Sequence, residues 1–377
     1  MDTARGPSLL GRMSEGRVLR ALQARGPLSR AEVSRHAGLS APAVSRAVAS
    51  LLRSGLLEEG AEAEATGGRP ALRLRLANAS SQVVGIAVDT DSCLLVSAGL
   101  DGVPHGRPVG IDTPETYEGL IDALARAARR ISRPGAALLG VGLSLPGLID
   151  SRTGRGVLSP NLPMTDGRCP AADLAEALGV ECRLLQESHA LCLAEMAHGH
   201  DDFAVLDVHT GVGLGVVSGG RLLAGHRGMA GEIGHVTVVP DGRACACGNR
   251  GCLETVANDA SLAWRVSKRL GRKVGLEQAL GLATLAELDD ACKYLAVGVA
   301  AVVNLFNPAR LFVHGRLFDA DPALFDRMVK SAAKRALKPP FADCSIQRAT
   351  GTKWQGAVAG IIQHVTGRHS PEVRHAP

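Results

Sequence analysis

Apolar residues recur at helical spacing in three short segments near the N-terminus, each closed by glycine. The segments are RVLRALQAR (17–25), RAEVSRHAG (30–38) and APAVSRAVASLLRSG (41–55). Ser29 and Ser40 precede the second and third segments as N-cap residues, and Glu32 completes a capping-box pattern after Ser29. The pattern predicts three helices, of which the last two are joined by a tight turn.

The pattern changes to strict alternation after the third helix. Leu72, Leu74 and Leu76 alternate with two arginines, which predicts a strand, and Leu56 and Leu57 begin a partner strand. Two helices joined by a tight turn and followed by a two-stranded wing are typical of a winged helix-turn-helix domain that binds DNA. The alternative interpretation is a small helical bundle that contacts protein.

The candidate DNA contacts lie at the start of the third helix and at the tip of the wing. They are Ser40, Ala41, Ala43, Ser45, Arg46 and Arg69. Small side chains let a helix approach base edges, and Arg46 can reach a guanine or a phosphate. Arg69, in the GGRP sequence of the wing tip, could enter a minor groove.

From residue 82 onward, continuous apolar runs alternate with helical segments. The apolar runs include QVVGIAV, ALLGVGLSL and FAVLDV, and helices are expected at 256–271, 285–306, 322–336 and 353–366. Alternating strands and helices over about 290 residues predict an α/β fold in two lobes.

Charge is distributed unevenly along the chain. Residues 1–76 hold 12 Arg, no Lys and seven Asp or Glu, whereas the remainder holds 30 basic and 30 acidic residues. A basic N-terminal module therefore precedes a neutral one, which favours a polyanion as its partner. We expect a cytoplasmic protein without membrane contact, because no apolar run is long enough to span a membrane and the N-terminus lacks the apolar core of a signal peptide.

One histidine and three cysteines lie close together in GEIGHVTVVPDGRACACGNRGC (231–252). His235, Cys245, Cys247 and Cys252 give the spacing His-x9-Cys-x-Cys-x4-Cys. Nine cysteines in a cytoplasmic protein argue for thiols or metal rather than disulfides. One imidazole and three thiolates suit a tetrahedral Zn²⁺ with a structural role. The alternative is a set of reduced core cysteines beside an unrelated histidine.

The long segment from Thr210 to Glu254 resembles the ROK family, which groups bacterial repressors and sugar kinases. It begins TGVGLGVVSGG and ends GNRGCLE, and supporting matches are GVGLSLPGLID, NLP (161–163) and QESHALCLAE. The resemblance covers nearly the whole chain. It implies a two-lobed actin/hexokinase-like domain behind the winged head, as in the repressor branch of the family, and ROK proteins commonly bind zinc at the cysteine segment.

The expected organisation follows from the pattern and the resemblance together. It consists of a flexible N-terminus (1–15), a winged helix-turn-helix domain (16–78), a first ROK lobe (79–200), a second lobe with the zinc site (201–352), a C-terminal helix that returns to the first lobe (353–368) and a tail (369–377).

The resemblance also implies a sugar pocket, in which the Glu and His of the family's GExGH segment contact sugar hydroxyls. The candidate sugar-binding residues are Asn161, Gln186, Glu187, Glu232 and His235. Glu232 precedes His235 by three residues, so a metal that fixes His235 would also hold Glu232 at one wall of the pocket.

Three departures from the family's kinases argue against catalysis. The loop that handles metal and phosphate in ROK kinases matches Ala87-Val88-Asp89-Thr90-Asp91, where Ala87 replaces an acidic residue and two carboxylates replace glycines. Carboxylates repel phosphate at close range. Glu187 matches the position of the family's catalytic aspartate, but its side chain is longer and places the carboxylate further out, so we interpret it as a vestigial base. The glycine pair that borders the nucleotide in ROK kinases matches His314-Gly315-Arg316 here, where the larger side chains would crowd a nucleotide.

The sequence therefore favours a transcriptional repressor of carbohydrate genes. It would bind double-stranded operator DNA as a homodimer or homotetramer and change its affinity when a sugar binds, with structural Zn²⁺ and without ATP. One alternative is an ATP-dependent sugar kinase with an added DNA-binding head. Another is a DNA-binding protein whose ligand-free ROK domain serves only for dimerisation.

Overall fold

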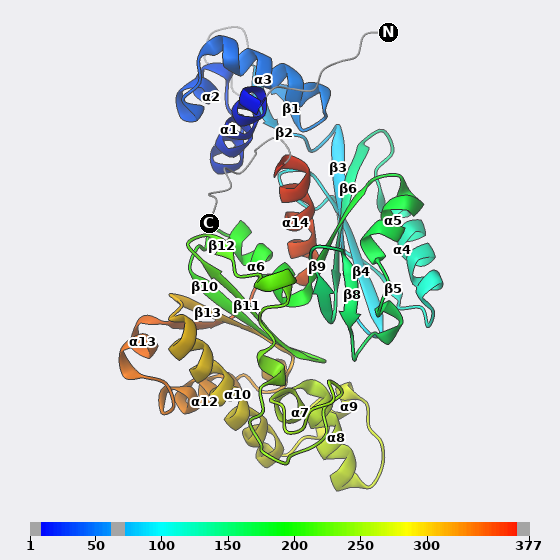
Figure 1. The fold of residues 1–377 in the computed structure, drawn as a ribbon, viewed down its shortest axis with the longest axis vertical. Coiled ribbons are helices and arrows are strands. Elements are labelled where there is room, and N and C mark those ends of the chain that lie inside the picture. The colour runs from blue at the N-terminus through cyan, green and yellow to red at the C-terminus, as the bar shows by residue number, and fades with distance from the viewer. Residues whose placement is uncertain (1–8, 62–71, 368–377) are drawn as a thin grey trace. The chain divides into compact units, whose positions relative to one another are not determined.

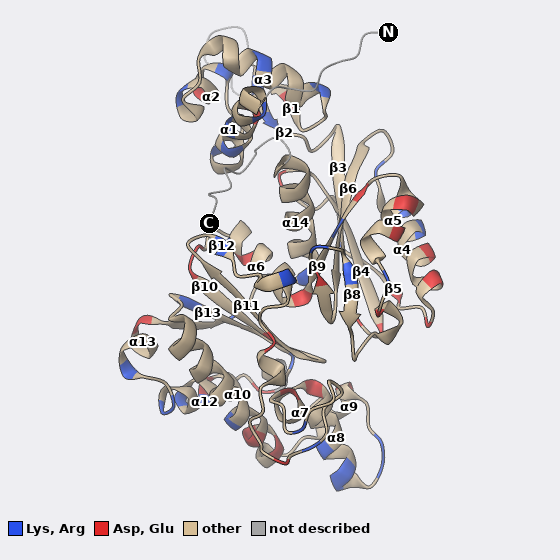
Figure 2. Ribbon diagram, in the orientation of Figure 1, with Lys and Arg blue, Asp and Glu red and all other residues tan. Residues whose placement is uncertain are grey.

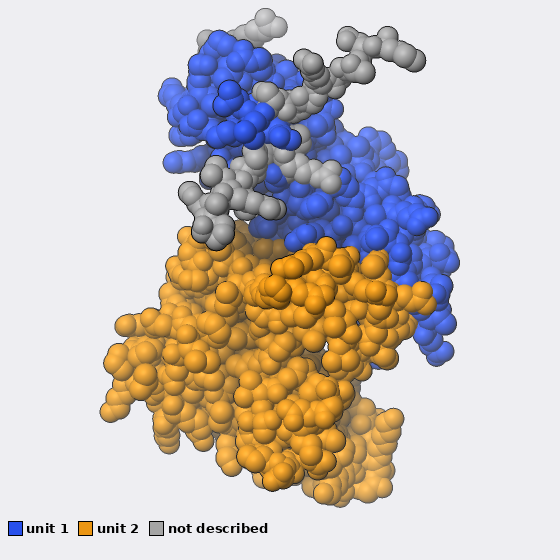
Figure 3. Space-filling view, in the orientation of Figure 1, with its two compact units in different colours: residues 1–143, 171–184, 357–377 blue, residues 144–170, 185–356 orange. Residues whose placement is uncertain are grey.

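The computed structural model describes residues 9–61 and 72–367, and these form two compact units (Figure 3). Unit 1 comprises described residues up to 143 together with 171–184 and those from 357 onward, and unit 2 comprises 144–170 and 185–356. Residues 185–200, which the sequence analysis grouped with the first lobe, belong to unit 2 because their helix packs on strands of that unit.

The winged head is the first part of unit 1 (Figure 1). Its elements are α1 (Leu9–Arg25), α2 (Arg30–Ala37), α3 (Ala41–Arg53), β1 (Leu57–Ala61) and β2 (Leu72–Leu76). Helix α1 begins at Leu9 rather than at the expected residue 17. Leu9, Leu10 and Met13 are all exposed, so the first part of the helix buries no apolar face. Without such a face, its sequence lacks the periodic pattern by which a helix is predicted.

Local signals set the ends of the next two helices. Ser29 and Glu32 form the expected capping box, with the Ser29 N–H donating to the Glu32 carboxylate at 2.8 Å. Gly38 ends α2 in the left-handed region, with φ of 58°. Ser40 lies at the N-cap of α3, but its side chain makes no capping hydrogen bond.

The two strands of the wing pair in the expected antiparallel way, with Leu57 opposite Leu76 and Ala61 opposite Leu72. Leu74 is buried and also pairs through its backbone with Leu28, which ties the wing to the helices. The wing tip, including Arg69, lies outside the described residues.

The rest of unit 1 is a five-stranded sheet in the order β5-β4-β3-β6-β9. Its strands are β3 (Ser81–Val88), β4 (Ser92–Ala98), β5 (Val109–Asp112), β6 (Ala137–Leu145) and β9 (Glu181–Gln186). Helices α4 (Tyr117–Ile131) and α5 (Pro170–Leu178) cover one face, and α14 (Lys353–Gly367) covers the other (Figure 1). Gly142 allows α14 to approach, because a Cβ there would lie 1.8 Å from the Ala357 carbonyl oxygen.

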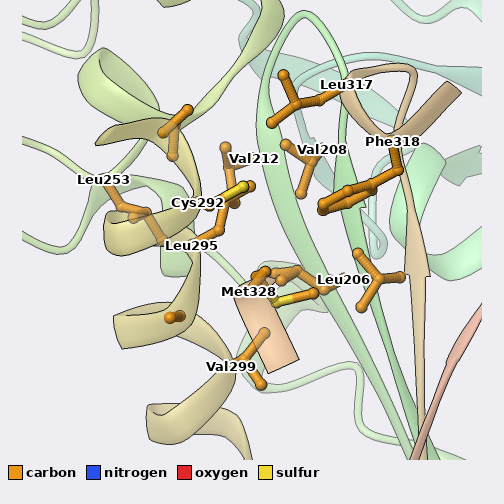
Figure 4. Packing of buried hydrophobic residues seen from close by; sticks show 14 of the residues in the cluster. Leu206, Val208, Val212, Leu253, Cys292, Leu295, Val299, Leu317, Phe318 and Met328 are labelled. Carbon is orange, nitrogen blue, oxygen red and sulfur yellow. The ribbon is translucent and has the colours of Figure 1, made fainter. Parts of the chain in front are cut away.

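Unit 2 is built on a mixed sheet in the order β12-β11-β10-β13-β14. Its strands are β10 (Phe203–Val208), β11 (Val212–Ser218), β12 (Arg221–Leu222), β13 (Arg310–His314) and β14 (Ser345–Arg348). The main core lies between this sheet and helices α10 (Leu285–Phe306) and α12 (Ala323–Ala333), where Leu206 and Val208 pack near Leu295 and Val299 (Figure 4).

Helix α6 (Glu187–Ala197) covers the opposite face of the same sheet (Figure 1). Phe203 and Val205 pack there against Leu191 and Cys192. Because successive side chains of a strand point to opposite faces, Asp207 belongs to the α6 face as well. The sheet thus separates an apolar side from a side that becomes polar toward the carboxyl ends of β10 and β13.

The remaining elements of unit 2 are short. They are β7 (Leu148–Asp150), β8 (Arg155–Leu158), η1 (Pro163–Thr165), η2 (His226–Gly228), η3 (Ile233–His235), α7 (Glu254–Ala257), α8 (Asp259–Leu270), α9 (Leu276–Leu282), α11 (Leu317–Ala320) and α13 (Lys338–Asp343). The single helix expected at 256–271 is interrupted at Asn258, whose side chain caps α8 by accepting the Ser261 N–H. Within the described part of the chain, no helix combines the length and apolarity needed to cross a membrane.

Candidate metal centre and ligand cavity

The four expected metal ligands converge on one point in unit 2. The ligand atoms of His235, Cys245, Cys247 and Cys252 all lie within 4.8 Å of one another. The Cys247 and Cys252 sulfurs are 3.8 Å apart, and the Cys245 sulfur is 3.7 Å from His235 Nδ1. Two sulfurs bound to one tetrahedral zinc ion at 2.3 Å are separated by about 3.8 Å. The donor set and its spacing therefore fit a four-coordinate ion.

Glycines make this convergence possible. Gly251 has φ of 66°, and a Cβ there would lie 1.7 Å from the Val239 carbonyl oxygen. That carbonyl also receives the Gly242 N–H, while the Cys245 N–H donates to the Asn249 carbonyl to close a tight turn. A side chain at position 251 would push Cys252 out of the cluster.

Burial and neighbouring thiols raise the pKa of Cys252 to about 12. Without a metal, Cys252 is therefore protonated at neutral pH. A divalent ion that binds here must displace thiol protons, which makes its binding pH-dependent.

His235 joins the cluster to a cavity. Its Nδ1 faces the Cys245 sulfur, whereas its Nε2 lies 3.8 Å from the Glu232 carboxylate. The cavity is open to solvent. All five candidate sugar-binding residues line it, together with Pro146, Gly147, Pro160, Ser188, Asp207, Gly211, Val212, Gly213 and Glu254.

Gln186, Glu232 and Glu254 are among the lining residues whose side chains can form hydrogen bonds with a ligand. Gln186 is the last residue of β9, and its amide nitrogen donates to the Gly147 carbonyl at 3.3 Å. Its amide oxygen is buried and, among the described residues, has no hydrogen-bond partner. Burial raises the pKa of Glu232 and of Glu254, so both carboxyls have an increased tendency to hold a proton.

Sequence reasoning did not identify Glu254 as a pocket residue. It begins α7, two residues after Cys252, and its carboxylate accepts the Val212 N–H at 3.0 Å. Its position directly after a metal ligand, at a helix start, was the available signal.

Lys353 was also missed, because its partners are far away in sequence. From the start of α14 its ammonium contacts the Glu187 carboxylate at 2.5 Å and the Asp207 carboxylate at 3.2 Å. Burial would raise the pKa of Asp207, but Lys353 and two hydrogen-bonded histidines outweigh it and hold that pKa well below its usual range. Glu187 is thus paired with a cation within the cavity wall.

The DNA-contact candidates that the structure describes lie on the first two turns of α3. Ser40, Ala41, Ser45 and Arg46 are exposed, and Ala43 is half-buried. Figure 2 shows basic residues on α2 and α3 of the head.

The loop compared with the kinase phosphate loop is closed by hydrogen bonds within the chain, and a glycine-rich segment of unit 2 is a strand. In the turn between β3 and β4, the Asp89 N–H donates to the Ser92 carbonyl and the Thr90 N–H donates to the Asp89 carboxylate. In the TGVGLG segment, Gly213 and Gly215 lie within β11. A Cβ at Gly215 would lie 2.3 Å from the Cys192 sulfur, so this glycine lets α6 pack closely on β11.

Comparison with known proteins agrees with this architecture. The sequence profile of the ROK family matches residues 107–365, and that of the MarR family matches residues 10–69. The chain is 27% identical over 353 residues to the DNA-binding transcriptional dual regulator NagC of Escherichia coli strain K12, covering 88% of this chain and 87% of NagC. It is 27% identical over 349 residues to the xylose repressor of Bacillus subtilis strain 168, covering 89% of this chain and 90% of that protein.

Solved structures share the fold of this chain in whole or in part. A ROK family transcriptional regulator, described as a homolog of the E. coli MLC protein, matches with a TM-score of 0.79 and 23% identity over 96% of this chain and 98% of its own. The ROK hexokinase from Thermus thermophilus matches with a TM-score of 0.61 and 29% identity over 74% of this chain and 97% of its own. The regulator therefore matches nearly the whole chain, including the winged head, whereas the hexokinase matches about three quarters of the chain.

Proposed function

Because this chain belongs to the ROK family, we propose that it is a transcriptional repressor of carbohydrate genes. It binds operator DNA through the winged head and senses a sugar or sugar derivative in the cavity beside the cysteine cluster. The observation that carries this proposal is a polar cavity bordered by His235, in a chain that begins with a winged helix. The names of NagC and of the xylose repressor support it.

The head supports DNA binding through its geometry and its charge. Four of the candidate contacts are exposed at the start of α3, where a recognition helix presents its side chains to the major groove. The surplus of arginine in the first 76 residues supplies attraction to phosphate. We propose that Ser40, Ala41, Ala43, Ser45 and Arg46 contact DNA, with Arg69 from the wing.

The cavity supports a polyhydroxylated ligand. Asn161 and Gln186 supply amides, Glu187 and Glu232 supply carboxylates, and His235 supplies an imidazole nitrogen. Such planar groups form hydrogen bonds with hydroxyls in fixed directions. We propose that the unpartnered Gln186 oxygen accepts a hydrogen bond from the ligand, because a buried acceptor without a donor is costly.

We propose that the ion at the cysteine cluster is Zn²⁺ with a structural role. Three thiolates and one imidazole fill a tetrahedral shell and leave no position for a substrate. The ion holds Nδ1 of His235 and so directs Nε2 toward Glu232 and the cavity. Its contribution is to orient one wall of the sugar site.

We propose that the chain does not phosphorylate sugars. The Asp89 and Thr90 N–H groups are already bonded to the chain, so they are not available to a phosphate. Glu187 is paired with Lys353, which weakens it as a proton acceptor. His314, where kinases of the family have glycine, is hydrogen-bonded to Asp207 and stacks near His209.

We further propose a cytoplasmic homodimer or homotetramer. Helix-turn-helix proteins usually read two half-sites with two copies of the recognition helix. The sugar regulates DNA binding only if its affinity differs between the DNA-binding conformation and another conformation.

DNA selection and a ligand screen test the proposal. The purified chain is mixed with sheared DNA from its source genome, and the retained fragments are sequenced. A thermal-shift screen of sugars and sugar phosphates is run in parallel, with ATP and radiolabelled phosphate transfer measured on the same sugars. We expect a small set of enriched promoter fragments, at least one stabilising sugar and no phosphate transfer. Uniform retention of DNA, or turnover of ATP with a sugar, would refute the proposal.

A further inference from the structure

A second group of possible metal ligands lies at the carboxyl ends of β10 and β13. These strands are parallel, and their register places Asp207 directly opposite His314. His209 follows the end of β10. The ligand atoms of Asp207, His209 and His314 all lie within 4.8 Å of one another. The group is separate from the cysteine cluster and shares no residue with it.

The strand pattern explains why two of the three residues meet. Phe203 and Val205 of β10 and Phe312 of β13 pack on the α6 face of the sheet. Asp207 and His314 follow Val205 and Phe312 by two residues, so they point to the same face. Polar residues at the ends of two buried strands therefore meet side by side.

The three side chains share one oxygen atom. Nδ1 of His209 lies 3.0 Å from Asp207 Oδ1, and Nδ1 of His314 lies 2.8 Å from the same oxygen. The two imidazole rings have centroids 4.5 Å apart. The other oxygen, Oδ2, contacts Lys353 at 3.2 Å, and Lys353 also pairs with Glu187. The carboxylate is thus fixed in orientation by a residue outside the group, as in metal sites whose ligands are oriented by neighbours.

Access and burial also suit an ion. The Asp207 side chain is 7% exposed, whereas the two imidazoles are 20% and 23% exposed. Asp207 lines the cavity, so one side of the group faces solvent. Two imidazoles and one carboxylate form a donor set that borderline divalent ions accept, with the remaining positions open to water.

We propose that Asp207, His209 and His314 form a second metal site, which binds Zn²⁺ or a similar divalent transition-metal ion. Asp207 Oδ1 and the two Nδ1 atoms are the ligands, and water completes the coordination. When a neutral imidazole donates from Nδ1, its proton must move to Nε2 as the metal binds, so a neutral ring releases no net proton. The proposal is independent of the function proposed above.

Metal counting on the full chain tests the proposal. The protein is loaded with Zn²⁺, passed through a desalting column and analysed for bound zinc by mass spectrometry. We compare the wild type with His209→Gln and His314→Gln. Glutamine can still donate a hydrogen bond to Asp207 but is a poor zinc ligand, so the fold should be kept. We expect each variant to hold one zinc equivalent fewer than the wild type, whatever the occupancy of the cysteine cluster.

A spectroscopic readout accompanies the count. Co²⁺ added to wild type that carries a single zinc equivalent, which the thiolates of the cysteine cluster take first, should give visible absorption without thiolate-to-cobalt charge transfer, and His314→Gln should lose that absorption. His226→Gln, which changes an exposed histidine outside the group, serves as the matched control and should retain both signals. Equal zinc content in the wild type and both variants, with no cobalt absorption in the wild type, would overturn the proposal.

Discussion

At the residue scale, His235 is the side chain on which the site depends. One ring nitrogen lies by the Cys245 sulfur and the other lies 3.8 Å from Glu232, so a single imidazole belongs to the metal cluster and to the cavity. An ion bound to Nδ1 leaves Nε2 protonated and able to donate a hydrogen bond toward the cavity. Losing the ion should therefore disturb both stability and ligand binding.

Replacing Cys247 by serine tests the role of the ion. We expect Cys247→Ser to lose one zinc equivalent and to lower the free energy of unfolding by about 3 kcal/mol or more, because a structural metal is lost. Zinc analysis and thermal unfolding measure the two effects. Cys169→Ser, at a partly buried cysteine outside the cluster, should retain its zinc. Full zinc content in Cys247→Ser would contradict the assigned ligand set.

Glu232→Gln separates ligand binding from metal binding. The amide keeps the shape of the side chain but loses its charge, so zinc should remain bound. We expect the affinity for the stabilising sugar to fall at least tenfold, or about 1.4 kcal/mol, because a charged acceptor is lost. Calorimetry measures the affinity, and Glu176→Gln on the surface of α5 is the control. Unchanged sugar affinity in Glu232→Gln would remove this residue from the site.

At the element scale, the elements that the sequence predicted were those with strong local signals. The capping box of Ser29 and Glu32, the alternation of Leu72 to Leu76 and the apolar face of α10 each specify their element within a few residues. Helix α9 and the start of α1 were not predicted, because exposed apolar residues conceal the helical periodicity there. Helix propensity and apolar periodicity are local signals, whereas contacts with the rest of the fold determine whether segments such as α9 become helical.

The same distinction applies to the candidate site. The proposed zinc ligands and Glu232 lie within 21 residues of one another, so their spacing could be recognised in the sequence. Lys353 and His314 reach Asp207 across 146 and 107 positions, and only the folded sheet brings them together. In the sequence, the available signal for Asp207 and His314 was that each is a polar residue at the end of an otherwise buried strand.

Strand β1 carries a residue that connects the head to the following sheet. Glu58 accepts the N–H groups of Ala79 and Ser80 at 3.0 Å each and pairs with Arg75 at 2.8 Å. Burial would raise the pKa of Glu58, but these hydrogen bonds outweigh it and lower the pKa. A lowered pKa contributes stability above the unfolded value of 4.5, and this stability is lost as pH falls through the folded value.

We therefore expect Glu58→Gln to destabilise the chain at pH 7 by about 1 to 2 kcal/mol, since charge-assisted hydrogen bonds are lost. The difference from the wild type should shrink as pH falls below about 4, where the wild-type carboxylate is itself protonated. Denaturant unfolding at several pH values measures it. Glu59→Gln, at the exposed neighbour, is the control. A difference that does not depend on pH would contradict this account.

Helix α3 carries the prediction for DNA. We expect Arg46→Ala to weaken operator binding about tenfold or more, within the 1 to 3 kcal/mol typical of an arginine contact to a base. Fluorescence anisotropy at fixed salt measures it. Arg126→Ala, at an exposed position of α4, should bind as the wild type does. Equal affinities of the two variants would show that α3 does not read DNA through Arg46.

At the scale of the whole molecule, the chain combines a basic head with a neutral domain that contains the cavity. Gln186 ends β9 and Glu187 begins α6, so two residues that line the cavity are neighbours in the chain. A ligand that binds one conformation of the chain more tightly than another shifts the population toward that conformation. If the ligand changes the affinity of the head for DNA by some factor, then by thermodynamic linkage DNA bound to the head changes the affinity for the ligand by that same factor.

The most direct test of the account is operator affinity measured with and without the sugar identified in the thermal-shift screen. Anisotropy titrations of the enriched promoter fragment are performed at one salt concentration, with the wild type and Glu232→Gln. We predict at least a fivefold change in the dissociation constant of the wild type, the lower range of allosteric coupling, and no change for the variant. A sugar that binds tightly yet leaves DNA affinity unchanged would contradict the claim that the cavity regulates the head.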